Sequence, residues 1–214
     1  NTAKIEIGGL DSAQAMINAD VNGSNLIDIS GQDLNLMEGA LAKTWDTGSR
    51  VNVIADGNVL IQSQQLANSA LTNAKMSSAG SVHVRADGTV YVAGDIFAED
   101  TVWVNASRDV SVYGSIKSGE GNTAGKVHVR AGIATAVADA AAASATIAAD
   151  SLSSGSIYVL GEANIQSDGT VQLDAGTDVF LDASASSSAG TRKVQTPTFR
   201  TETITYDKLI GYNQ

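Results

Sequence analysis

Short segments in which every second residue is hydrophobic recur along most of the chain. Gly, Asp, Asn and Ser separate the segments, and these residues favour turns. Alternation with a period of two is typical of a β-strand with one buried face. The pattern predicts strands in KIEIGG from Lys4, NLIDISG from Asn25, DLNLMEG from Asp33, RVNVIADG from Arg50, NVLIQS from Asn58, SVHVRADG, TVYVAGD, TVWVNASRD, DVSVYGS, KVHVRAG, SIYVLGE, TVQLDAG and DVFLDAS.

The spacing of these segments indicates a repeat. A second strand often begins eight residues after the first, as Val59 does after Val51, and Val90 after Val82. The same offset separates Val110 from Val102, and Val179 from Val171. Each unit begins with a leading strand, and the first hydrophobic residues of these strands recur every 20 to 31 residues: Ile5, Ile27, Val51, Val82, Val102, Val127 and Ile157.

Two strands joined by a tight corner, with a variable return, are typical of one coil of a parallel β-solenoid. We therefore predict an all-β solenoid of seven to eight coils, with a rod length of about 35–40 Å at the usual strand spacing. A β-sandwich uses similar strands, but its alternation is usually longer and its core richer in aromatic residues. The ten aromatic residues of this chain favour the solenoid.

The pentapeptide VHVRA occurs twice and contains the two histidines of the chain, His83 and His128. In a solenoid, Val82, Val84 and Ala86 face inward, and the equivalent residues of the next coils stack on them. Both histidines then face outward, with Trp103 on the coil between them. Two coils place the backbones of the two histidines about 9–10 Å apart. This distance favours two exposed strand residues over a shared metal ion or a catalytic pair.

The same outward positions predict a binding strip. Trp103 between the two histidines, with Tyr158 beyond, would give a narrow aromatic line along the rod, suited to the apolar faces of sugars. Arg85 and Arg130 lie beside it and would contact anionic groups. The alternative is that these side chains are outward because aromatic residues pack well across coils.

Corners are predicted at Asp56-Gly57-Asn58, Asp87-Gly88-Thr89, Ser107-Arg108-Asp109 and Asp168-Gly169-Thr170, where Gly, Asn and Asp tolerate positive φ. The acidic residues are spread through the corners instead of being clustered as carbohydrate-cleaving enzymes require. We therefore predict no catalytic residue, no metal ligand and no enzyme. Calcium held between neighbouring corner acids is the alternative to a turn role for Asp56, Asp87, Asp109, Asp168 and Asp178.

Two stretches interrupt the strand pattern, at residues 62–80 and 133–155. Both are rich in Ala and poor in β-branched residues, and both coincide with the longest intervals between units. They are predicted to be insertions into coils, formed either by short helices or by further strands of small residues.

Composition and charge restrict the classes of function. The absence of cysteine excludes disulfides, cysteine-bound zinc and thiol catalysis in this segment. A net charge of −10 argues against nucleic-acid binding through phosphates. No hydrophobic run approaches the length of about 18 residues that a membrane-spanning helix needs. The first residue is Asn1, and no signal-peptide pattern follows it, which favours a mature or excised segment.

The last residues, 191–214, differ from the repeat region at 1–190. They carry a net charge of +2, from four basic and two acidic residues, so the rest of the chain carries −12. They also contain the one proline, Pro197. We predict a tail that caps the last coil, adds as a strand to a neighbouring molecule, or is disordered. The residues proposed for assembly are Phe199, Arg200, Ile204 and Tyr206.

The segments VHVRADGTVYVAGDI, TVWVNASRDVSVYGSI and VQLDAGTDVFLDAS resemble the filamentous-haemagglutinin repeats of bacterial two-partner-secreted exoproteins. The shared pattern is V-x-V-x-A-x-x-D/G-V-x-V-x-G-x-I, over Arg50 to Asp182 with interruptions, and more loosely over Ile5 to Gly39. The family's secretion motif of the Asn-Pro-Asn-Gly type is missing. The resemblance therefore implies an interior or C-terminal piece, or a small relative exported differently.

This resemblance implies a right-handed β-helix at the bacterial surface or outside the cell. It also implies a role in adhesion, aggregation or biofilm matrix, and it carries no catalytic residue. The expected partners are surface glycans or further copies of the chain. A subunit of a self-assembling filament is the alternative function, and a β-helix that binds or cleaves polysaccharide is less favoured.

Overall fold

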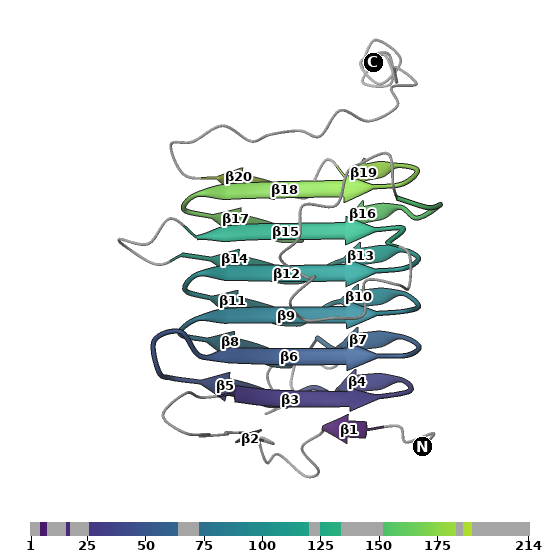
Figure 1. The fold of residues 1–214 in the computed structure, drawn as a ribbon. Coiled ribbons are helices and arrows are strands. Elements are labelled where there is room, and N and C mark those ends of the chain that lie inside the picture. Colours follow the sequence, from purple (N-terminus) through teal and green to yellow (C-terminus); the bar gives the residue numbers. More distant parts are fainter. Residues whose placement is uncertain are drawn as a thin grey trace.

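Three parallel β-sheets form the part of the chain that the computed structural model describes, which comprises residues 5–7, 16–17, 26–63, 73–119, 125–133, 152–182 and 186–189. No helix occurs among these residues. Strands that follow one another along the chain belong to the three sheets in turn, and each pairs with its counterparts one coil before and one coil after (Figure 1). The all-β prediction is confirmed, and the arrangement is consistent with a parallel β-solenoid.

Sheet 1 contains the longest strands, of six residues each, which run across the front of Figure 1. Val and Ile, which favour extended backbone, occupy most of its inward positions and alternate with outward side chains that are mostly polar or aromatic. Its described strands are β3 (Leu26–Gly31), β6 (Arg50–Ala55), β9 (Ser81–Ala86), β12 (Thr101–Ala106), β15 (Lys126–Ala131) and β18 (Thr170–Ala175).

Sheet 2 follows sheet 1 after each corner and has strands of three residues. Because side chains alternate, such a strand directs its two end residues inward and presents one residue outward. Its described strands are β1 (Ile5–Ile7), β4 (Leu34–Leu36), β7 (Val59–Ile61), β10 (Val90–Val92), β13 (Val110–Val112), β16 (Ile157–Val159) and β19 (Val179–Leu181).

Sheet 3 completes each coil and was not predicted as a sheet. Its strands typically carry one large inward residue, followed two positions later by Ala, Ser or Thr, so the hydrophobic alternation is too short to stand out. Its described strands are β2 (Met16–Ile17), β5 (Leu41–Thr44), β8 (Lys75–Ser78), β11 (Asp95–Ala98), β14 (Ser115–Ser118), β17 (Asn164–Ser167) and β20 (Ser186–Ala189).

The core consists of columns of similar residues in register, as predicted for sheet 1. Val82 pairs with Val102, and Val102 pairs with Val127, and all three are fully buried. The columns that start at Val84 and Ala86 continue in the same way. A fully buried valine contributes about 1.5–3 kcal/mol relative to an exposed one, so these columns hold the coils together.

Two of the residues chosen to lead coils belong to another sheet. Ile5 pairs with Leu34, and Ile157 pairs with Val110, so both lie on sheet 2. The interval from Val127 to Ile157 does not join two leading strands, because the insertion at 133–155 follows the sheet 1 strand β15 directly. The next hydrophobic strand is therefore the sheet 2 strand of the same coil.

The corners between sheets 1 and 2 contain the predicted turns, but their glycines have a different role. Gly57 and Gly88 do not have positive φ, contrary to the prediction. A Cβ atom on Gly57 would lie 2.5 Å from Asp33 Oδ1, and one on Gly88 would lie 2.5 Å from Asn58 Oδ1. Glycine is required there because each corner packs closely on the corner of the preceding coil.

One predicted corner does not correspond to the others. Asp168-Gly169-Thr170 joins β17 to β18 and thus lies between sheets 3 and 1. The corner equivalent to residues 56–58 in that coil is Gly176-Thr177-Asp178, where the Gly176 N–H donates to Ala131 O.

Several strands of sheet 3 end in a hydroxyl residue whose side chain faces inward. Thr44 Oγ1 donates to Ser78 Oγ at 2.9 Å, and Ser118 Oγ donates to Ser167 Oγ at 3.0 Å. The residue between these two pairs is Ala98. Each buried hydroxyl of the four therefore has a partner, which removes the cost of its burial.

Several predictions fall outside the described residues. These are the central parts of both insertions, at 64–72 and 134–151, and the tail at 191–214 with Phe199, Arg200, Ile204 and Tyr206. The end of the first insertion lies in a strand, because β8 covers Lys75–Ser78.

Candidate functional site

Three residues of the predicted binding strip form one outward column on sheet 1. Trp103 pairs with His83 on one side and with His128 on the other, as predicted. Arg85 and Arg130 lie two positions along the same strands, with Asn105 between them. The strip therefore exists as an arrangement of neighbouring residues.

The placement of Tyr158 in this strip is wrong. Tyr158 lies on β16 of sheet 2, where it pairs with Ser111 and Phe180. The position beyond His128 on sheet 1 is taken by Gln172. The cause is the assignment of Ile157 to a leading strand, because Tyr158 is the next residue of the same strand.

The strip is also much less exposed than predicted. Trp103 is 8% exposed, and His83 and His128 are half-buried. The Trp103 indole stacks on the His128 imidazole with ring centroids 4.0 Å apart, and the guanidinium carbon of Arg130 lies 4.7 Å from the indole centroid. The faces that a sugar would need are occupied by neighbouring side chains.

Asp174 and Gln172 complete this group, which we call the Trp103 cluster: Trp103, His128, Arg130, Gln172 and Asp174. Arg130 Nε lies 3.5 Å from Asp174 Oδ2, and Gln172 Nε2 donates to the same oxygen at 2.8 Å. Arg130 is 2% exposed and Asp174 is 5% exposed. Sequence reasoning missed both β18 residues, although aligning TVQLDA with KVHVRA would have placed Gln172 beside His128 and Asp174 beside Arg130.

Burial governs the electrostatics of the ion pair. It lowers the pKa of Arg130, against the opposing effect of Asp174. It raises the pKa of Asp174, although Arg130 and Gln172 both favour the ionised form. Each charge of the pair depends on the other, because an isolated buried charge is strongly unfavourable.

Both histidines are neutral at pH 7. Burial, and secondly the charge of Arg50, lower the pKa of His83 from 6.5 to about 4. Burial lowers that of His128 to about 4 as well, with smaller effects of Arg130 and Lys126. Neither ring nitrogen of His128 has a hydrogen-bond partner among the described residues. A general base must reach the proton it removes, so this geometry suits packing better than proton transfer.

We expect acid to destabilise the protein through these histidines. An unfolded histidine titrates near pH 6.5 and the folded ones near 4, so their stabilisation is complete above 6.5 and is lost as the pH falls toward 4. The loss should be about 1–2 kcal/mol per histidine after allowance for partial exposure. Urea unfolding at pH 7.5 and 4.5 should show a smaller loss in a His83→Asn/His128→Asn variant than in the wild type. An equal loss in both would contradict this explanation.

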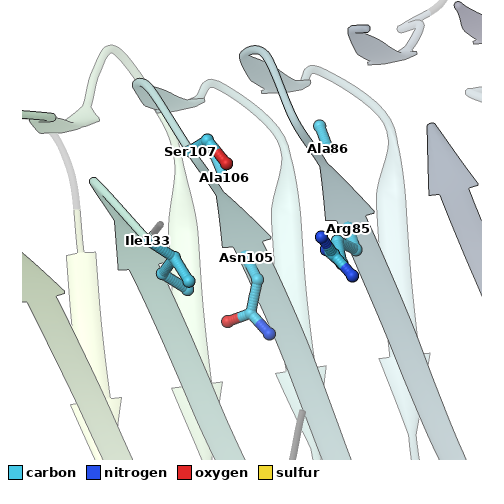
Figure 2. A pocket seen from close by; sticks show the side chains of 6 residues that line it. All are labelled: Arg85, Ala86, Asn105, Ala106, Ser107 and Ile133. Carbon is cyan, nitrogen blue, oxygen red and sulfur yellow. The ribbon is translucent and has the colours of Figure 1, made fainter. Parts of the chain in front are cut away.

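A small pocket lies at the end of the strip, and Figure 2 shows Asn105 in it between Arg85 and Ile133. Its volume is about 10 Å³, which is room for a single water molecule. Arg85 forms an ion pair with Asp87, with 3.0 Å between Arg85 Nη2 and Asp87 Oδ1. The pocket is too small for a sugar or a cofactor.

Two acidic residues near the corners, Asp33 and Asp109, accept hydrogen bonds from backbone N–H groups. Asp33 Oδ1 accepts the N–H of Asn58 at 2.8 Å, and Asp109 Oδ1 accepts the N–H of Ser156 at 2.8 Å. Asn58 Oδ1 likewise accepts the N–H of Thr89 at 2.9 Å. Within the described ranges, no group of three or more His, Asp or Glu side chains is placed to hold a metal ion.

Exposed aromatic residues gather on sheet 2 instead of sheet 1. Tyr91, Tyr113 and Phe180 are exposed, and Tyr158 is half-buried. Sequence reasoning missed this group because it assigned the aromatic residues one at a time to strands whose sheet was unknown. Alignment of the similar tripeptides at 90–92 (VYV), 157–159 (IYV) and 179–181 (VFL) would have placed Tyr91, Tyr158 and Phe180 at equivalent positions.

Comparison with protein-family models, curated proteins and solved structures finds no match for this chain. Among the described residues there is also no helix with the length and hydrophobicity to cross a bilayer.

Proposed function

We propose that this chain is a non-enzymatic structural and adhesive segment of a bacterial surface or biofilm-matrix protein. The observation that carries the proposal is the register of the three sheets, in which similar residues stack on one another, as Val51, Val82 and Val102 do. An active site needs different reactive groups that converge on one point. Stacked coils build a stiff rod with long faces, which is the property an adhesive or matrix protein requires.

The finer architecture in this proposal is a right-handed β-helix of about seven coils. Seven strands in each of sheets 2 and 3 support the number. The handedness is supported by the path of the chain in Figure 1 and by the strong preference of parallel crossovers for the right-handed form. At the usual strand spacing such a rod is about 30–35 Å long.

Location outside the cell belongs to the same proposal. It is supported by the resemblance of VHVRADGTVYVAGDI and its related segments to filamentous-haemagglutinin repeats. The shared pattern V-x-V-x-A-x-x-D/G-V-x-V-x-G-x-I coincides with one strand of sheet 1, the corner, one strand of sheet 2 and the first inward residue of sheet 3.

End-to-end assembly is a second candidate, favoured by one observation. Leu181 occupies an inward position of sheet 2, and its partner Val159 is fully buried, yet Leu181 is 53% exposed. The last described strand of sheet 2 thus presents an apolar residue that further strands would bury. A second copy is the proposed source of those strands, with the tail residues Phe199, Arg200, Ile204 and Tyr206 as the alternative contact.

Electron microscopy of the purified chain in negative stain, with sedimentation velocity, tests both candidates. Separate, unassembled molecules support the adhesive segment, and regular fibres support assembly. If coils stack end to end, Leu181→Lys should abolish fibres, whereas Trp45→Lys, at a residue of similar exposure outside the core, should not. Fibres that survive Leu181→Lys but disappear in a Phe199→Ser/Tyr206→Ser variant would assign assembly to the tail. A far-UV circular dichroism spectrum without dominant β-structure would contradict both candidates.

A further inference from the structure

An outward column of aromatic side chains follows sheet 2 along the rod axis. Tyr91, Tyr158 and Phe180 occupy the single outward position of their strands, and the register aligns Tyr91 with Ser111, Tyr158 and Phe180 in successive coils. Tyr113 stands beside Ser111, and its ring centroid is 5.1 Å from that of Tyr91. We call Tyr91, Tyr113, Tyr158 and Phe180 the sheet 2 column.

The rings of this column are accessible, in contrast to the Trp103 cluster. Tyr91 is 37% exposed, Tyr113 is 43% exposed and Phe180 is 52% exposed. Large hydrophobic side chains grouped on a surface mark binding sites more often than isolated ones do.

The shape of the column fits one linear polymer. Three-residue strands present one side chain per coil, so the column is one residue wide except next to Ser111, where Tyr113 adds a second side chain. Its three exposed rings offer on the order of 300 Å², well below the roughly 800 Å² that each partner contributes to a stable protein interface. The spacing of about 4.8 Å between coils is close to the length of one sugar unit in an extended glycan. Tyr91, Tyr158 and Phe180 place rings at the first, third and fourth of four successive coils.

The charge of the column selects among glycans. From β4 to β19 the outward residues of sheet 2 are Asn35, Leu60, Tyr91, Ser111, Tyr158 and Phe180, and all six are uncharged. The chain as a whole carries −10, which repels anionic polymers. Tyrosine rings combine an apolar face with a hydroxyl group, and this suits a ligand with apolar faces and hydroxyl edges.

We propose that the sheet 2 column binds a neutral, linear polysaccharide lying along the rod axis. The site specifies the adhesive part of the proposed function and rests on it. The proposed contacts are stacking of sugar faces on Tyr91, Tyr113 and Phe180, with the half-buried Tyr158 between them.

Isothermal titration calorimetry with cellohexaose, maltohexaose and a linear galactan as neutral probes, and with polyuronate as the anionic probe, tests this site. At least one neutral probe should bind, and a Tyr91→Ala/Phe180→Ala variant should weaken that binding at least tenfold. Trp45→Ala is the matched control, because Trp45 is 50% exposed but lies outside the column. Circular dichroism verifies the fold, and single Phe180→Ala provides a milder variant.

Absence of binding to all neutral probes would overturn the proposal, as would equal weakening in Trp45→Ala or preferential binding of polyuronate. Self-association that the double variant abolishes, without glycan binding, would make the column an interface between copies and would also overturn it. A circular dichroism spectrum dominated by β-structure together with any of these results would leave the structural proposal standing and remove the glycan site alone.

Discussion

Replacement of Val110 by aspartate is expected to unfold at least the central coils of the protein. Val110 is fully buried between Val90 and Ile157 in the core, on the inward face of sheet 2. The carboxylate would have no charged partner among these apolar side chains. Burial of an unpaired charge should cost at least about 4 kcal/mol, a large share of the stability of a typical domain. Urea unfolding followed by far-UV circular dichroism measures the loss.

Ser111→Asp is the matched control for this substitution. Ser111 follows Val110 on the same strand, faces outward and is partly exposed. The same carboxylate should there change the free energy of unfolding by less than about 1 kcal/mol, because it stays in contact with water. Similar urea midpoints for the two variants would refute the inward and outward assignment of sheet 2.

Replacement of Arg130 by methionine is expected to destabilise the protein by about 3 kcal/mol or more. Methionine retains much of the volume but leaves Asp174 buried without its cation, and it removes the contact with the Trp103 indole. An Arg130→Met/Asp174→Leu variant should recover most of the loss, because no charge then remains buried. Thermal and urea unfolding of the two variants provide the comparison.

Arg85→Met tests whether burial causes this effect. Arg85 occupies the equivalent position two coils away, and its ion pair with Asp87 lies in a more exposed corner. A partly exposed pair contributes at most about 1 kcal/mol, so this variant should remain close to the wild type. Equal losses for Arg85→Met and Arg130→Met would show that the buried pair has no special role.

The inward residues of sheets 1 and 2 were predictable because the side-chain alternation is a local property. Val82, Val84 and Ala86 alternate with polar residues, and the next coils repeat the pattern. Sheet 3 was missed because DIFA and SIKS each contain one large inward residue, and two positions do not establish a period. β16 was assigned to the wrong sheet because the insertion at 133–155 lengthens the sequence between coils, whereas the coils remain one strand spacing apart.

The outward residues were harder to assign, because their environment depends on contacts that the alternation does not encode. The sequence placed Trp103 between two histidines, and the register agrees. Trp103 is buried because the His128 imidazole and the Arg130 guanidinium pack against its indole. These contacts depend on side-chain conformations. Asp174 belongs to the same group through pairing with a strand 44 residues away in the sequence, across an insertion of irregular length.

The bonds between corners have a consequence for how the protein can change in length. The side chains of Asp33 and Asn58 each accept a hydrogen bond from the backbone of the following coil, at Asn58 and Thr89 respectively. Energy is therefore shared between adjacent coils and is not stored in distant contacts. Under tension along the axis, such a molecule would peel coil by coil from a free end, and gene duplication of one coil would extend it without a new core.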